Sequence, residues 1–328
     1  MVKIAQIGAG RMGSVHARNA AGNARLELAY LVDPQPEAAQ ALAAETGAKV
    51  VSLDQVLNDP AVRGVIVASS TAAHLDNTLA CLAAGKAVFC EKPLDLDLAS
   101  LRAAEAELAK SEASLFVAFN RRFDPHFRAL KARIESGVIG ELEALQIVNH
   151  DPAAPPAHFI PTSGGLFKDF TIHDFDMARW LSPEEPVEIF AWASCLVDQA
   201  IAEAGDTDTA RVMLRDQAGR LTTICNTRRS GCGYDQRIEA FGSRGMATAS
   251  DLSPDTVQVW TQAGQAAAAL HPNFMSRYAQ AYRNEMNHFA DILAGLAVPE
   301  TGYEASVRSL ALAEAAALSV KTGGPVRL

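Results

Sequence analysis

A glycine-rich motif directly after the first apolar run constrains the fold of this chain more than any other feature. The run Lys3 to Ile7 has the character of a buried strand, and the motif is followed by a helical stretch to about Ala21. In a strand-turn-helix unit, the first glycine permits a tight turn, the second lets the backbone approach a pyrophosphate, and the third lets the helix pack on the strand. The helix start favours negative charge. Although glycine triplets also occur in plain turns, we predict dinucleotide contacts at Gly8, Gly10, Arg11, Met12 and Gly13.

The second apolar run supports this interpretation and indicates which dinucleotide is bound. Leu26 to Val32 ends in Asp33, twenty residues beyond Gly13. An acidic side chain at this strand end accepts hydrogen bonds from a ribose 2′-hydroxyl and repels a 2′-phosphate. Pro34 and Gln35 follow, with no Arg or Lys close by to hold such a phosphate. The sequence therefore favours NAD over NADP.

The first 120 residues continue to alternate between strands and helices, which predicts a doubly wound parallel sheet of the Rossmann type. Further strands are expected at 49–51, 64–68, 87–90 and 115–119, and helices at 36–46, 54–57, 72–84 and 98–110. Ligands of such sheets lie at the carboxyl ends of the strands. We therefore expect cofactor contacts from Ser70, Thr71, His74 and Glu91, although His74 could equally be a polar residue that starts a helix.

Lys92 follows a buried strand on the same rim, in the sequence Glu91-Lys92-Pro93. The proline restricts Lys92 to an extended conformation and makes a cis bond possible. A lysine fixed there can stabilise negative charge that develops on a substrate oxygen. The alternative is a solvated lysine in a turn.

Strand patterns dominate after Asn120, where a helix at 124–135 precedes a region that predicts an open, largely antiparallel sheet. The expected strands are 142–149, 187–197, 208–214, 221–227, 235–241 and 256–261, and helices resume at 276–293 and 304–321. The form of 265–270 is left open. The predicted fold is α/β, with an N-terminal Rossmann domain at 1–120 and a C-terminal α+β domain with a large, mostly antiparallel open sheet at 121–328.

A probable helix at 164–181 places Asp169 and His173 four positions apart, on one helical face. A carboxylate beside an imidazole can move a proton near neutral pH. The plain alternative is an acidic residue that complements the helix dipole and a structural histidine.

Composition limits the remaining classes of function. At 328 residues, the chain is too long for one ordinary core, so two domains are expected. The net charge of -9 provides no basic surface for nucleic acid. Five scattered cysteines without a C-x-x-C pair, and histidines without metal-ligand spacing, favour a reducing compartment and no metal site. No apolar run approaches the roughly 18 residues that span a bilayer. We expect a cytoplasmic protein without nucleic-acid or membrane partners.

Several segments resemble a known oxidoreductase family over essentially the whole chain. Gly8 to Gly13, Ala87 to Pro93 and Gly164 to His173 resemble the family of glucose-fructose oxidoreductase and inositol dehydrogenase. Phe119 to Phe127, Ser163 to Trp180 and Tyr234 to Met246 are more narrowly similar to bacterial inositol 2-dehydrogenases. The resemblance implies a homotetramer built through the large sheets.

The resemblance also implies roles for individual residues. Lys92, Asp169 and His173 match the catalytic residues of the family, and Arg122 and Asp151 match positions that contact the polyol, as do the three catalytic residues. His150 departs from the pattern, because an arginine is expected there in close relatives. This departure leaves the identity of the polyol open.

The expected activity is NAD-dependent oxidation of a cyclic polyol, from myo-inositol to 2-keto-myo-inositol (scyllo-inosose). His173 would act as general base, Lys92 would stabilise the oxygen, and Asp169 would orient the base or its substrate. The alternatives are a dehydrogenase of scyllo- or D-chiro-inositol or of an aldose, and a non-catalytic regulator of the same fold that senses NAD.

Overall fold

The computed structural model describes the backbone of residues 1–328 and the side chains of residues 1–156 and 158–328. The chain forms two compact units. Unit 1 consists of Met1–Phe123 and Ala281–Leu310, and unit 2 consists of Asp124–Gln280 and Ala311–Leu328. Whereas the sequence suggested a single division after residue 120, the structure packs a late segment, Ala281–Leu310, with the first unit.

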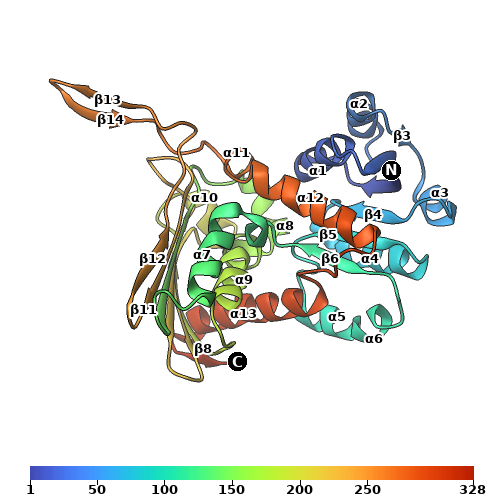
Figure 1. Ribbon diagram of the computed structural model, residues 1–328. Helices are drawn as coiled ribbons and strands as arrows, with labels where there is room; N and C mark the ends of the chain where they lie inside the picture. Colours follow the sequence, from blue (N-terminus) through green and yellow to red (C-terminus); the bar gives the residue numbers. More distant parts are fainter. The chain divides into compact units, whose positions relative to one another are not determined.

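Unit 1 is built on a parallel sheet of six strands in the order β3-β2-β1-β4-β5-β6 (Figure 1). The strands are β1 Val2–Ile7, β2 Leu26–Val32, β3 Lys49–Val50, β4 Gly64–Val67, β5 Ala87–Glu91 and β6 Leu115–Ala118. The strand order reverses direction between β1 and β4, which pair directly. The predicted doubly wound parallel sheet is confirmed, and ligands of such sheets bind at this switch point.

The helices of unit 1 lie between successive strands, except for η2, which follows the last strand. They are α1 Arg11–Ala21, α2 Pro36–Thr46, α3 Leu53–Asn58, η1 Thr71–Ala73, α4 His74–Ala83, α5 Leu98–Ala103, α6 Glu105–Leu108 and η2 Asn120–Phe123. The single helix expected at 98–110 is divided at Ala104. Most of α12, Ala279–Leu293, also belongs to this unit. It packs closely on the sheet, since a Cβ atom at Gly64 would lie 2.8 Å from Phe289.

Unit 2 is built on a sheet of seven strands in the order β12-β11-β7-β10-β9-β8-β15 (Figure 1). The strands are β7 Leu142–His150, β8 Pro186–Ser194, β9 Thr209–Asp216, β10 Leu221–Thr227, β11 Asp235–Gly242, β12 Gly245–Ala249 and β15 Val326–Arg327. β7 and β10 run parallel, and the other neighbours run antiparallel. This confirms the predicted large and mostly antiparallel sheet, although β12 and β15 were not expected.

Helices α7 and α9 lie on one face of this sheet in Figure 1. Apart from the first two residues of α12 and a π-helical segment, the helices that lie wholly or partly in unit 2 are α7 Pro125–Glu135, η3 Ala157–Phe159, α8 Ile160–Ser163, α9 Ile172–Leu181, α10 Gln199–Glu203, α11 Phe274–Arg277 and α13 Tyr303–Thr322. The continuous helix predicted at 164–181 differs from the structure. Gly164 and Gly165, with φ of 82° and 83°, end α8. The chain then forms a π-helical segment, Phe167–Thr171, that leads into α9.

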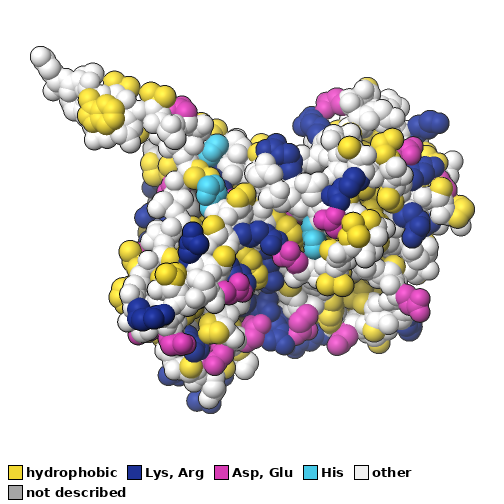
Figure 2. All heavy atoms as spheres, in the orientation of Figure 1, with side chains coloured by type: hydrophobic (Ala, Val, Ile, Leu, Met, Phe, Trp, Pro, Cys, Tyr) yellow, Lys and Arg dark blue, Asp and Glu magenta, His cyan; other side chains and the backbone are white. Residues whose placement is uncertain are grey.

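A two-stranded hairpin extends away from the large sheet in Figure 1. It pairs β13 Gln258–Thr261 with β14 Gly264–Ala267, and every residue of both strands is exposed. Figure 2 shows hydrophobic side chains along this hairpin, and Trp260 is 68% exposed. A strand is thus present at the position predicted for 256–261, but it begins at Gln258 and lies in this separate hairpin, not in the large sheet to which the sequence assigned it. The second strand covers part of 265–270.

Candidate active site

The glycine loop of unit 1 has the geometry of a dinucleotide cradle. Gly8 has a φ of 103°, and a Cβ atom there would lie 2.1 Å from the carbonyl oxygen of Ala68. A Cβ atom at Gly13 would lie 2.3 Å from the Gly8 carbonyl oxygen, whereas one at Gly10 would meet nothing within 4 Å. The first and third glycines are therefore required by the fold itself. The open space at Gly10 is where a pyrophosphate can approach the backbone.

The start of α1 suits an anionic ligand. Among the side chains that the structure describes, none caps this helix start, and its first turn contains no acidic residue. Arg11 is exposed and Met12 is half-buried at the same turn. Backbone N–H groups and the helix dipole at such a start favour a phosphate.

Asp33 is fixed at the end of β2, beside the glycine loop. Its Oδ2 atom accepts a hydrogen bond of 2.6 Å from the Ala9 N–H group, and its Oδ1 atom accepts one of 2.7 Å from the Gln35 N–H group. A carboxylate has about four acceptor sites, so it can still accept from ribose hydroxyls. The local residues therefore fit NAD.

The rim formed by the ends of β4 and β5 contains the other predicted cofactor residues. Ser70 is exposed and Thr71 half-buried, whereas His74 is only 2% exposed. His74 Nδ1 lies 2.8 Å from the Pro93 carbonyl oxygen, and Nε2 lies 3.2 Å from that of Ser69. Burial lowers the pKa of His74, so the neutral ring has one N–H, and the shorter contact to Pro93 is the hydrogen bond. In this structure, His74 joins two strand-end loops.

Glu91 and Lys92 stand at the end of β5. Glu91 is 7% exposed, and Lys92 joins Pro93 through a cis peptide bond. Burial acts to raise the pKa of Glu91, but a hydrogen bond with His16 and the charges of His16 and Lys92 lower it, and the net direction is downward. Glu91 is therefore a buried carboxylate. Arg122, in η2 after β6, is half-buried and belongs to the same unit.

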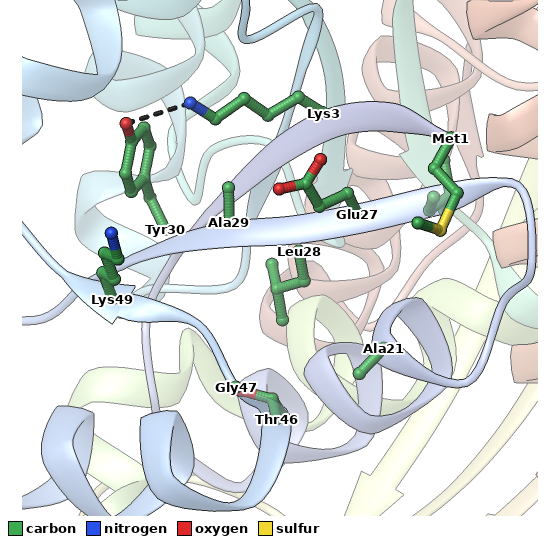
Figure 3. Close-up of a pocket in the computed structure, with 11 residues that line it drawn as sticks. Met1, Lys3, Ala21, Glu27, Leu28, Ala29, Tyr30, Thr46, Gly47 and Lys49 are labelled. Carbon is green, nitrogen blue, oxygen red and sulfur yellow. Dashed lines mark hydrogen bonds between the residues drawn. The ribbon is translucent and has the colours of Figure 1, made fainter.

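A separate concave region of unit 1 lies away from this rim. A cavity of about 340 Å³ is lined by residues of β1, β2 and their neighbours, among them Lys3, Glu27, Tyr30 and Lys49 (Figure 3). Lys3 donates to Tyr30 Oη at 3.0 Å and to Asp59 at 2.7 Å. The cavity includes Met1 and Leu26, at the amino-terminal starts of the first two strands. Ligands of doubly wound sheets bind at the opposite, carboxyl ends, so this cavity is not the cofactor site.

Unit 2 brings two of the predicted substrate residues together on one arginine. Asp151 follows β7 and Arg228 follows β10, at the carboxyl ends of the parallel pair. Arg228 Nη1 lies 3.4 Å from Asp151 Oδ2, and Nη2 lies 3.0 Å from Asp169 Oδ2. Arg228 is 3% exposed, and its guanidinium lies 4.8 Å from the centre of the Phe170 ring. The planar guanidinium therefore fixes two carboxylates with respect to each other.

A buried polar network fixes the helix that carries His173. Asp174, which is fully buried, accepts hydrogen bonds of 2.8 Å from both Asn149 and Asn226. Asn226 Oδ1 in turn accepts from Thr171, at the start of α9. These bonds attach α9 to β7 and β10, whose ends carry Asp151 and Arg228. A fully satisfied buried network of this kind gives a helix one preferred orientation.

His150, the residue that departs from the family pattern, is tied to the neighbouring strand. Its Nδ1 atom lies 3.0 Å from Asp235 Oδ2. Burial acts to raise the pKa of Asp235, but its bonds to His150 and Arg237 lower it well below the usual range. Asp235 is therefore ionised, and His150 donates to it.

The predicted site residues are thus divided between the two units. Lys92 and Arg122 belong to unit 1, and Asp151, Asp169 and His173 to unit 2. Asp169 lies in the π-helical segment and His173 in the first turn of α9, so their separation of four positions crosses a change of helix type. Arg228 was missed by the sequence interpretation. Its position directly after a predicted strand, in Asn226-Thr227-Arg228-Arg229, was the available signal.

Two further features of the described residues bear on the class of protein. No helix in the described part of the chain is long and apolar enough to cross a membrane. Within the same residues, no group of three or more His, Cys, Asp or Glu side chains is placed to hold a metal ion.

Comparisons with known proteins agree on one family. Residues 2–119 match the oxidoreductase family with an NAD-binding Rossmann fold, and residues 127–248 match the GFO/IDH/MocA C-terminal domain. The chain is 43% identical to an inositol 2-dehydrogenase of Rhizobium meliloti, over 97% of both chains.

Two solved structures extend this similarity. A myo-inositol dehydrogenase from Corynebacterium glutamicum is 40% identical, with a TM-score of 0.95, and the match covers 100% of this chain and 99% of that one. A scyllo-inositol dehydrogenase from Lactobacillus casei, with bound NAD(H) and scyllo-inositol, is 26% identical, with a TM-score of 0.93 over 100% and 99% of the two chains. The chain therefore belongs to the GFO/IDH/MocA oxidoreductases, NAD-dependent dehydrogenases whose cofactor domain is the Rossmann fold of unit 1.

Proposed function

We propose that this enzyme oxidises a cyclic polyol, and that its substrate is myo-inositol, which becomes 2-keto-myo-inositol. NAD, when bound, accepts the hydride. The substrate hydroxyl loses its proton to His173, the carbon loses hydride, and a ketone forms. His173 acts as general base, because imidazole can accept a proton near neutral pH.

Lys92 and Asp169 support this step in the proposal. The ammonium group of Lys92 stabilises negative charge on the oxygen as the proton leaves. Asp169 orients His173 or the substrate, and Asp151 and Arg122 bind other hydroxyls of the ring. The main support for the proposal is that buried Arg228 holds two carboxylates, Asp169 at 3.0 Å and Asp151 at 3.4 Å. Fixed carboxylates are acceptors suited to neighbouring hydroxyls of a polyol.

The names of the relatives support the substrate class but divide on the isomer. The Rhizobium and Corynebacterium relatives are inositol and myo-inositol dehydrogenases, at 43% and 40% identity. The Lactobacillus structure with bound scyllo-inositol, at 26% identity, favours scyllo-inositol as the second candidate. The higher identity favours myo-inositol.

A panel of polyols tests this assignment. The purified enzyme is supplied with NAD and with myo-, scyllo- or D-chiro-inositol or an aldose, and NADH formation is followed by absorbance. We expect the highest kcat/KM with myo-inositol and a 2-keto product. A higher value with scyllo-inositol would select the second candidate. Binding of NAD without turnover on any polyol would instead indicate an NAD-sensing regulator.

We also propose that the enzyme is a cytoplasmic homotetramer. All five cysteines are free thiols, which suits a reducing compartment. One face of the unit 2 sheet is exposed and carries large apolar side chains, including Trp192, Met213, Phe241 and Met246. Large exposed apolar patches are typical of protein interfaces, and we infer that a second copy of the chain covers this face.

A further inference from the structure

Unit 1 contains a buried cluster of three ionisable side chains next to Glu91-Lys92-Pro93, the segment called here the Lys92 turn. His16 comes from α1, Glu91 from the end of β5, and Glu285 from α12. His16 and Glu285 are fully buried, and Glu91 is 7% exposed. Ionisable side chains are rarely buried without a partner or a function, so the arrangement of this cluster needs an explanation.

Glu91 connects the cofactor helix to the backbone of Lys92. Its Oε1 atom lies 2.6 Å from His16 Nε2, and its Oε2 atom accepts a hydrogen bond of 3.1 Å from the Lys92 N–H group. The carboxylate can only accept, so His16 Nε2 carries the proton and donates it. Two hydrogen bonds therefore link α1, which begins at the glycine loop, to the peptide that carries Lys92.

The Lys92 turn is also held from its other side. His74, from α4, bonds to the carbonyl oxygen of Pro93 at 2.8 Å. The Glu91-Lys92 peptide is thus tied to buried His16 by way of the Glu91 carboxylate. The Pro93-Leu94 peptide, one peptide beyond the Lys92-Pro93 bond, is tied directly to buried His74. A side chain that must present its amine to a reacting oxygen benefits from such a fixed backbone.

Glu285 is the third member of the cluster, and it adds no second negative charge. Tyr282, Glu285 and Phe289 follow one face of α12, at spacings of three and four residues. Tyr282 contacts the His16 ring at 5.9 Å and Phe289 contacts Phe89 at 5.7 Å, so Glu285 faces the same layer. Burial and the charge of Glu91 raise its pKa well above the usual range. One carboxyl of the pair is therefore ionised and the other protonated.

We propose that His16 is a positioning residue for Lys92, which it orients through the Glu91 carboxylate, and that α1 thereby couples the dinucleotide loop to the catalytic amine. This inference rests on the proposed function, in which Lys92 stabilises the reacting oxygen. His16 itself touches neither substrate nor reacting atoms. Its contribution is to keep Glu91 in the one orientation that also binds the Lys92 N–H group.

Two amide variants of His16 test this role, since they differ mainly in reach. The amide nitrogen of glutamine can occupy the place of Nε2, whereas that of asparagine is too short to reach Glu91. We expect His16→Asn to lower kcat for myo-inositol by roughly tenfold to hundredfold, and His16→Gln to restore most of it. NAD affinity, measured by titration calorimetry, should change little in either variant.

A kinetic isotope effect separates positioning from general damage. With myo-inositol deuterated at C2, the isotope effect on kcat should rise in His16→Asn, because hydride transfer becomes slower than product release. Equal kcat values and isotope effects in the two variants would overturn the inference. So would a loss in His16→Asn that is explained by a smaller folded fraction in thermal unfolding.

Two outcomes keep this test distinct from the test of the proposed function. If the wild-type enzyme does not oxidise myo-inositol, the proposed function fails before the variants are compared. If neither His16 variant folds, Glu91→Ala replaces them. Its methyl group can make neither hydrogen bond, so the same loss of kcat is expected, and a wild-type kcat would overturn the inference.

Discussion

His173 lies in the first turn of α9, where Asp174, the next residue, fixes the helix to the sheet. We predict that His173→Ala lowers kcat by on the order of a hundredfold or more, because the reaction loses its general base. NAD binding should be retained, since the dinucleotide loop lies in unit 1. His126→Ala, at an exposed position of unit 2, is the matched control. Near-normal turnover of His173→Ala would exclude His173 as the base.

Glu285 makes stability depend on pH. Both of its carboxyl oxygens are buried and lack a hydrogen-bond partner among the described residues, and its pKa is raised well above the usual range. The folded state therefore holds a proton that the unfolded state releases near pH 4.5. The contribution of Glu285 to the free energy of unfolding is fully present below pH 4.5. As pH rises from there toward the folded-state pKa, the free energy of unfolding falls by about 1.4 kcal/mol per pH unit.

We predict that Glu285→Gln removes this dependence, because the amide does not titrate. Urea unfolding at pH 5 and pH 8 should show a smaller decrease in the free energy of unfolding for the variant than for the wild type. Glu143→Gln, at an exposed position of β7, is the control and should follow the wild type. Equal decreases in Glu285→Gln and wild type would show that Glu285 is ionised in the folded state.

Asp33 joins β2 to the glycine loop, and its substitution tests the basis of cofactor choice. Asp33→Ser removes a carboxylate that would accept from the ribose and repel a 2′-phosphate. We expect the ratio of kcat/KM for NAD to that for NADP to fall, on the order of tenfold or more, since a hydrogen bond to a charged group contributes about 1.5–3 kcal/mol. Asp54→Ser, at an exposed position of α3, should leave this ratio unchanged. An unchanged ratio in Asp33→Ser would show that Asp33 does not contact the ribose.

Elements with strong local signals were predicted closely. The strand at 26–32 and the helix at 36–46 have the predicted bounds, because Asp33, Pro36 and Gly47 mark their ends. β12 was missed, since four of its five residues are not buried and it lacks a clear alternation. The π-helical segment was also missed, because a helical pattern does not distinguish a π-turn from an α-turn over five residues.

Contacts between distant residues were beyond the sequence interpretation. Arg228 binds Asp169 across 59 positions and Asp151 across 77. Asp174 likewise meets Asn149 and Asn226 only once the strands are paired. Local patterns identify the strand ends at which functional residues collect. They do not show which charged side chains from different strand ends will meet.

The exposed face of the unit 2 sheet favours the assembly of several copies of the chain. Phe190 pairs with Met213 across β8 and β9, and Phe241 pairs with Met246 across β11 and β12. Met213 and Phe241 are 45% and 50% exposed, on the face opposite the buried residues of their strands. A sheet face with this many apolar side chains loses unfavourable contact with water when a second copy covers it.

We therefore predict that the double variant Met213→Glu/Phe241→Glu dissociates the proposed tetramer, because like charges would be buried on both sides of the contact. Light scattering after size-exclusion chromatography should show a wild-type mass near four times the 34.8 kDa chain and a smaller mass for the variant. Leu296→Glu, at a position in unit 1 that is 76% exposed, is the matched control and should remain tetrameric. If the double variant keeps the wild-type mass, the interface between copies does not lie on this face. A wild-type mass of one chain would show that the apolar face does not bind a second copy, and its exposed side chains would then need another partner.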